Sequence, residues 1–270
     1  MNADALALTL RDFEVNEHPV VVHASLRSFG HFQGGAEGVV SVLKRDLKTV
    51  LMPAFSTDSV TLPPLDDRPM QNGCDYGDTS FWKLNSSKPF NIELQSVDPR
   101  MGRIAQVFAT SAGVRRSPHP WHSWAAFGDG SESIVGKHSW ECPHEPLQRL
   151  LDRRASVLLI GVDLTSCTAI HLAEDRAGRR PFVRWALDTD SSVRRIAVAG
   201  CAAGFGNLMP HLEDLFVQKR LGPCRLMVAP LDALVTRAAA VIGSEPEITR
   251  CSSDCLRCND AILGGLRSRM

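Results

Sequence analysis

Short, uninterrupted apolar runs recur along this chain and alternate with segments of helical periodicity. The run Pro19–Ala24, with the sequence PVVVHA, is rich in β-branched residues and predicts a buried strand. The next segment, 34–46, spaces its valines and Leu43 as an amphipathic helix does. Further strands are predicted at 49–55, 155–162 and 225–229, and further helices at 145–152, 167–176 and 231–242. Strands separated by helices predict an α/β fold with a central mixed, mainly parallel sheet flanked by helices.

The segment 57–100 interrupts this alternation. It is polar and rich in Pro, Asn, Asp and Ser, so we expect a long, loop-rich segment, and such loops often carry function. The chain shows no internal repeat and no linker, and a single domain over residues 1–270 is predicted.

Composition excludes several classes of protein. Apolar residues make up 44% of the 270 residues, which is enough for a sizeable core and unlike a disordered chain. Thirty basic and thirty acidic residues cancel, so neither nucleic acid nor a membrane surface is expected as a partner. No apolar run reaches the roughly 18 residues of a membrane span, and the N-terminus does not resemble a signal peptide. The chain has eight cysteines and no secretory signal, so we expect reduced thiols or metal ligands. This expectation favours a location in the cytosol.

The most informative polar motif follows the strand predicted at 155–162. Thr168, His171 and Glu174 stand at spacings of three, so His171 and Glu174 share a face of the predicted helix. A carboxylate beside an imidazole fixes its tautomer, and an imidazole with a pKa near ~6.5 suits a general base. The alternative is a structural histidine that packs near a helix start.

Two further segments combine small, polar and rigid residues. The segment SLRSFG, from Ser25 to Gly30, follows the first strand and precedes a helix, a position that favours binding of an anion such as a phosphate. The segment 116–123, RSPHPWHS, holds two prolines, two histidines and two hydroxyl groups. Prolines make such a loop rigid, which suits either ligand binding or a tight structural turn.

Three cysteines lie close together near the C-terminus. Cys251, Cys255 and Cys258 could bind structural zinc with a fourth ligand from Cys201, Cys224 or His211, or they could be ordinary free thiols. The same spacing occurs in radical SAM iron–sulfur motifs, but those open a barrel domain and this cluster closes the chain. Cys167, which adjoins the predicted base, is a candidate nucleophile by position alone; a small buried residue is the commoner role.

These motifs, in this order, resemble the aminoglycoside 3-N-acetyltransferase family. The resemblance runs in pieces from about residue 20 to 180. It is carried by VVVHASLRSFG, TVLMPAFS, MGRIAQVF, RRSPHPWHSWAAFG and the block from PLQRLLDRR to HLAEDR. The resemblance implies an α/β fold distinct from the Gcn5-like acetyltransferases, with acetyl-CoA as donor and a primary amine as acceptor.

The resemblance also implies roles for individual residues. His171 would be the base, Glu174 its partner, and Thr168 would line the site. The residues implied to bind the cofactor are Ser25, Leu26, Arg27, Ser28, Gly30, Ser117, His119 and Ser123. The deprotonated amine would attack the thioester directly; an acyl-enzyme at Cys167 and a non-catalytic metal-binding protein are the alternatives.

The sequence is compatible with two classes of acceptor amine. An aminoglycoside is polycationic and calls for carboxylates, whereas residues 200–230 contain Glu213 and Asp214 beside three basic residues. A small amine from a biosynthetic or detoxifying pathway therefore stands beside an aminoglycoside as the expected acceptor. The oligomeric state cannot be read from the sequence, and a homodimer is compatible with it.

Overall fold

Three apolar strands form the centre of a seven-stranded sheet in the computed structural model, which describes residues 1–78 and 87–264. They are β1 (Pro19–Ala24), β2 (Thr49–Pro53) and β6 (Ser156–Ile160), and β1 pairs in parallel with both of the others. Their central residues are buried because helices cover both faces of the sheet. This burial explains why the three strands read as continuous apolar runs.

The outer strands are antiparallel to their neighbours. The order across the sheet is β4-β5-β2-β1-β6-β10-β9, and the pairings outside the three central strands are antiparallel. The bounds are Arg115–Arg116 for β4, Trp124–Gly128 for β5, Val217–Leu221 for β9 and Cys224–Pro230 for β10. The predicted α/β fold with a mixed sheet flanked by helices is confirmed, and its parallel pairings lie at the centre.

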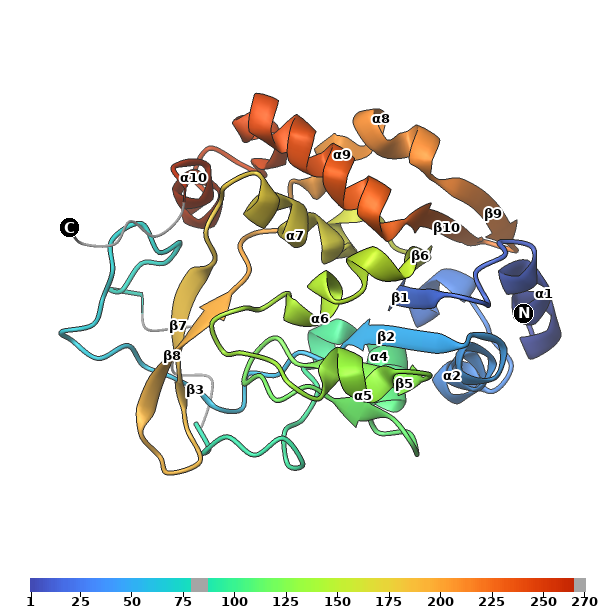
Figure 1. Cartoon of the computed structure of the whole chain (residues 1–270), viewed down its shortest axis with the longest axis horizontal. Coiled ribbons are helices and arrows are strands. Elements are labelled where there is room, and N and C mark those ends of the chain that lie inside the picture. The colour runs from blue at the N-terminus through green and yellow to red at the C-terminus, as the bar shows by residue number, and fades with distance from the viewer. Residues whose placement is uncertain (79–86, 265–270) are drawn as a thin grey trace.

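Alternate residues of the central strands enter two separate cores. Val20 and Val22 pack on one face and Val21 on the other, as the twofold period of a strand requires. The first core includes α1 (Ala3–Arg11), α2 (Gly35–Asp46) and α4 (Arg103–Ala109). The second includes α5 (Ser131–Val135), α6 (Glu145–Gln148), α7 (Ala169–Arg176), α8 (Met209–Leu212) and α9 (Leu231–Ser244). Figure 1 shows α7 and α9 running side by side along this second face.

A second, three-stranded antiparallel sheet stands beside the first. It has the order β3-β7-β8, with β3 at Val60–Thr61, β7 at Phe182–Leu187 and β8 at Val193–Val198. In Figure 1 the β7–β8 hairpin projects at the left, below α10 (Leu256–Ile262). The described part of 57–100 is loop-rich, as predicted, apart from β3 and a short 3-10 turn. None of the helices in the described ranges is long and apolar enough to cross a membrane.

Short 3-10 turns connect many of these elements. They are η1 (Leu26–Phe29), η2 (Pro99–Met101), η3 (Leu151–Arg153), η4 (Leu164–Ser166), η5 (Phe205–Leu208), η6 (Glu213–Leu215) and η7 (Pro246–Thr249). Turn η1 follows β1, and η4 follows β6, so both lie beyond the carboxyl ends of parallel strands. Gly161 lets these two turns approach, because a Cβ at this position, where φ is +64°, would lie 1.8 Å from Ser28 Oγ.

Candidate active site

A cleft of about 900 Å³ opens at the carboxyl ends of β1, β2 and β6. In open α/β sheets this edge is where ligands bind. Its walls include five of the residues that the sequence marks for the site, namely Ser25, Leu26, Arg27, Thr168 and His171. The α/β topology thus brings together two motifs that lie more than a hundred residues apart in the sequence.

His171 faces this cleft from the first turns of α7. Its Nδ1 lies 2.7 Å from Oε2 of Glu174, and both side chains are buried. Because the carboxylate accepts a hydrogen bond from Nδ1–H, the lone pair of the neutral imidazole is on Nε2. A neutral imidazole with Nε2 available is the form that accepts a proton, so this geometry suits a general base.

The carboxylate of Glu174 is itself held by a buried arginine. Arg179 donates to Glu174 Oε1, to Thr249 Oγ1 at 2.6 Å and to the carbonyl oxygen of Pro246. All three side chains in this chain of contacts are at most 8% exposed. A buried carboxylate stays ionised only if it is paired, and Arg179 supplies that pairing. Sequence reasoning missed Arg179, whose partner Thr249 is 70 residues away.

A second histidine–carboxylate pair lies against the first. His144 Nδ1 is 2.7 Å from Asp175 Oδ2, and the His144 ring stacks on His171 with centroids 5.7 Å apart and planes 3° apart. Phe205 packs against the other side of His171 at 4.7 Å. These contacts hold the His171 ring in one orientation, and no pattern in the sequence predicts them.

Two other histidines of the cleft wall are neutral. Burial lowers the pKa of His23 to about 4, and burial together with the neighbouring histidines lowers the pKa of His122 well below its usual value. The amide of Ala199 donates to His122 Nε2 at 3.2 Å, which fixes this ring as its Nδ1–H tautomer. At neutral pH neither ring adds a positive charge to the cleft.

The predicted loop 116–123 places three buried side chains beneath the cleft wall. Ser117, His119 and Ser123 are fully buried, and none of them is among the residues that line the cleft. His119 Nδ1 accepts the amide of His122 at 2.9 Å, and Ser123 accepts a bond from Arg116 at 2.7 Å. Their predicted role in binding the cofactor stays a prediction; the structure shows them positioning the segment that carries His122.

The remaining residues of the SLRSFG segment take different places. Ser28 turns away from the cleft, with its hydroxyl 3.1 Å from the thiol of Cys224 and 2.7 Å from the carbonyl oxygen of Ser25. Gly30 ends the η1 turn with a φ of +67°, outside the lining. Thr168 immediately precedes α7 and borders the cleft one turn before His171.

Cys167 is buried in the core of the domain. Its side chain packs in the second core, is 1% exposed and does not line the cleft. Burial raises the pKa of this thiol to about 12, so a thiolate nucleophile is not formed at neutral pH. This placement favours direct transfer over an acyl-enzyme at Cys167.

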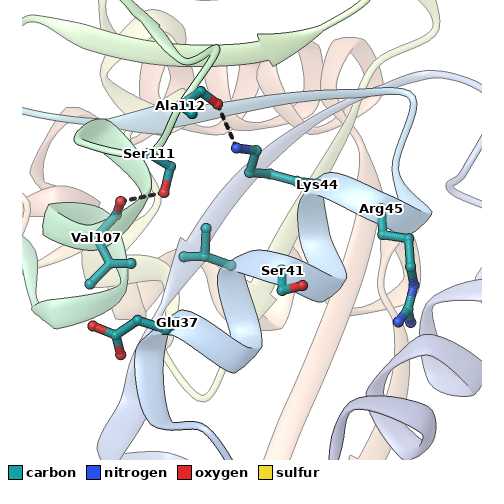
Figure 2. Close-up of a pocket in the computed structure, with 8 residues that line it drawn as sticks. Glu37, Ser41, Lys44, Arg45, Val107, Ser111 and Ala112 are labelled. Atoms are coloured by element: carbon teal, nitrogen blue, oxygen red, sulfur yellow. Dashed lines mark hydrogen bonds between the residues drawn. The ribbon is translucent and has the colours of Figure 1, made fainter.

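A second hollow lies between α2 and α4, away from His171. Figure 2 shows Lys44 in its wall, where the ammonium donates to the carbonyl oxygen of Ala112 at 2.7 Å. Its lining contains no histidine and no cysteine. Of these two hollows, the cleft is the one lined by a histidine that pairs with a carboxylate.

Comparison with known proteins gives the family of the chain. A profile of aminoglycoside 3-N-acetyltransferases matches residues 21–242. The chain belongs to the aminoglycoside 3-N-acetyltransferase family. It is 33% identical over 165 residues to the SPbeta prophage-derived aminoglycoside N(3')-acetyltransferase-like protein YokD of Bacillus subtilis, a match that covers 58% of each chain. The chain thus aligns with somewhat more than half the length of this curated relative.

Solved structures share the fold over almost the whole chain. The apoenzyme of aminoglycoside acetyltransferase AAC(3)-IVa superposes with a TM-score of 0.77 at 22% identity and covers 97% of both chains. AAC-IIIb, solved as a binary complex with CoASH, gives 0.73 at 19% identity over 90% of this chain and 97% of its own. The family membership and the fold implied by the sequence resemblance are confirmed.

Proposed function

We propose that this chain transfers an acetyl group from acetyl-CoA to a primary amine, with His171 as general base. The observation that carries the proposal is the pair of His171 Nδ1 and Glu174 Oε2 at 2.7 Å, on a histidine that lines the cleft. Family membership supports acetyl transfer as the reaction, and the complex of AAC-IIIb with CoASH supports CoA as the carrier.

The proposed reaction is a direct displacement. The amine attacks the thioester carbonyl carbon, and His171 Nε2 accepts the proton that the nitrogen loses. A C–N bond forms, the C–S bond breaks, and the imidazolium returns its proton to the leaving thiolate of CoA. Glu174 stabilises the transient imidazolium through Nδ1, and Arg179 holds the Glu174 carboxylate in place by donating to its other oxygen.

The charge of the cleft lining indicates which class of acceptor amine can bind. Four arginines line the cleft, Arg27, Arg100, Arg103 and Arg257. Asp98 is the one carboxylate in that lining as far as the structure describes it, and it is ion-paired to Arg100 at 2.5 Å. A polycationic ligand would meet this positive wall without carboxylates to bind it. We therefore place a small amine of low positive charge ahead of a polycationic aminoglycoside as the acceptor.

A thiol-release assay tests the reaction and the acceptor together. With acetyl-CoA, we expect release of CoA only when a primary amine is added, and a kcat/KM at least roughly tenfold higher for small amines bearing a carboxylate or phosphate than for aminoglycosides. The product amide is confirmed by mass spectrometry. Preference for aminoglycosides would refute the acceptor assignment, and no transfer to any amine would refute the proposed function.

Arg27 is expected to bind the phosphates of CoA. Its side chain is exposed at the cleft and forms no ion pair with any residue in the described ranges. Because a charge-assisted bond to phosphate contributes about 1.5–3 kcal/mol, Arg27→Ala should weaken CoA binding by roughly tenfold or more, with a smaller effect on kcat. Isothermal titration calorimetry measures the change.

Arg225→Ala is the matched control for Arg27→Ala. Arg225 is also exposed and loses the same charge, but it lies on β10 outside the cleft. An equal loss of CoA affinity in both variants would show that only the overall charge matters. Unchanged affinity in Arg27→Ala would remove this residue from the CoA site.

A further inference from the structure

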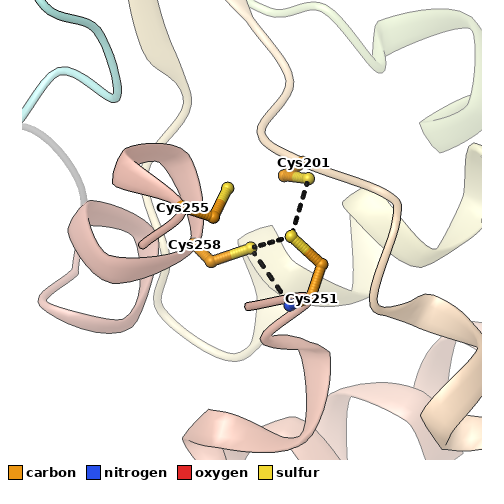
Figure 3. A group of neighbouring side chains, drawn as sticks. All are labelled: Cys201, Cys251, Cys255 and Cys258. Carbon is orange, nitrogen blue, oxygen red and sulfur yellow. Dashed lines mark hydrogen bonds between the residues drawn. The ribbon is translucent and has the colours of Figure 1, made fainter. Parts of the chain in front are cut away.

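Four cysteines from distant parts of the chain meet beside the cleft. Cys201 lies in the segment after β8, and Cys251, Cys255 and Cys258 lie at the start of α10 and just before it. Their sulfur atoms all lie within 4.8 Å of one another, and Figure 3 shows the four side chains pointing toward a common centre. Two of the four are buried and one is partly buried.

The spacing of these sulfur atoms matches a tetrahedral metal site. Cys201 Sγ lies 3.8 Å from Cys251 Sγ, which lies 3.5 Å from Cys258 Sγ. In a zinc–thiolate tetrahedron with Zn–S bonds of about 2.3 Å, neighbouring sulfurs are separated by about 3.8 Å. Disulfide bonds require sulfurs at about 2.05 Å, and none of the eight cysteines is in one here.

Backbone amides are directed at sulfur atoms of the cluster. The amide of Cys251 donates to Cys258 Sγ at 3.5 Å, and the amides of Cys258 and Ala203 are directed at the sulfurs of Cys255 and Cys201. Arg257, between the last two cysteines, brings a positive charge near Cys201. Amide donors and a nearby cation offset the charge that four thiolates place around one metal ion.

We propose that Cys201, Cys251, Cys255 and Cys258 bind one structural zinc ion that braces a wall of the active-site cleft. Four protein ligands fill the tetrahedron and leave no open position for catalysis. Binding releases the four thiol protons and leaves a site with a formal charge of −2. Of the fourth ligands expected from the sequence, Cys201 is the one at the cluster; Cys224 lies beside Ser28, and His211 is exposed on α8.

Zinc would brace the cleft because its cysteine ligands adjoin residues that line the cleft wall. Gly200 and Ala202, the two neighbours of Cys201, line the cleft, and so does Arg257, which stands between Cys255 and Cys258. The sulfur of Cys201 contacts that of Cys251, which lies 50 residues later in the chain. Zinc would therefore hold Arg257 against the 199–202 segment and keep both in the cleft wall.

Metal analysis of the tag-free full chain, purified without chelator, tests the site. We expect about one zinc per chain, with the four cluster thiols protected from alkylation in the native protein until a chelator is added. Cobalt substitution should give the intense visible bands of a tetrahedral thiolate site. Cys201→Ser should lose most of the zinc, whereas Cys142→Ser, a partly exposed cysteine outside the cluster, should retain it.

Trypsin tests the bracing independently of activity. Removal of zinc from the wild-type chain should expose the peptide bonds after Arg250 and Arg257 to cleavage, and re-added zinc should protect them. Unchanged cleavage would overturn the bracing role. Zinc near zero with all four thiols alkylated in the native chain, iron in place of zinc, a cluster disulfide, or full zinc in Cys201→Ser would each overturn the site itself.

Discussion

His171→Ala is expected to lower kcat by roughly 10²–10⁴-fold, the usual contribution of a positioned general base. The variant removes the imidazole that joins Glu174 to the cleft, so a protonated amine would have to lose its proton to water. CoA affinity should change little, because Nε2 acts at the reacting end of the thioester. Steady-state kinetics with saturating amine and calorimetry with CoA separate the two effects.

The control for His171→Ala is His211→Ala, which removes an exposed histidine on α8. It should leave kcat unchanged. Partial rescue of His171→Ala by added imidazole would show that a base is missing and not that the fold has been lost, and a thermal melt checks the fold directly. Activity within about threefold of wild type would rule out His171 as the base.

The central sheet could be predicted because its signal is local. The runs that form β1 and β6 are long, apolar and β-branched, and Pro19–Ala24 has the same bounds in the sequence prediction and in the structure. The hairpin of β7 and β8 was missed. In β8 the first three residues are exposed and the last three buried, so the strand shows neither the alternating pattern nor a continuous apolar run.

In the candidate site, too, local contacts could be predicted from the sequence and long-range contacts could not. His171 and Glu174 are three residues apart on one helix, and this spacing alone places them in contact. Arg179 and the stacked His144 were not predicted, because their contacts depend on how distant loops return to the sheet. The same reason left three candidates for the fourth ligand of the cysteine cluster: spacing relates Cys255 to Cys258 but carries no information on Cys201.

Arg179→Met is expected to lower both stability and kcat, because it leaves the Glu174 carboxylate buried without its guanidinium. Breaking a buried ion pair by removing one partner costs about 3–5 kcal/mol in the free energy of unfolding. The isolated carboxylate can regain neutrality by binding a proton, and it then no longer orients His171 as a base. Chemical denaturation measures the first effect, and kcat at saturating substrates measures the second.

Two further variants show whether Arg179 acts through Glu174. In Arg179→Met with Glu174→Gln, no buried charge remains, so much of the lost stability should return while kcat stays low, since the carboxylate beside His171 is gone. Arg176→Met is the matched control, because this exposed arginine at the end of α7 donates only a long bond to Thr236 Oγ1, at 3.3 Å, as far as the described residues show. If the double variant regained wild-type kcat along with stability, Arg179 would be a packing residue without a role in positioning the base.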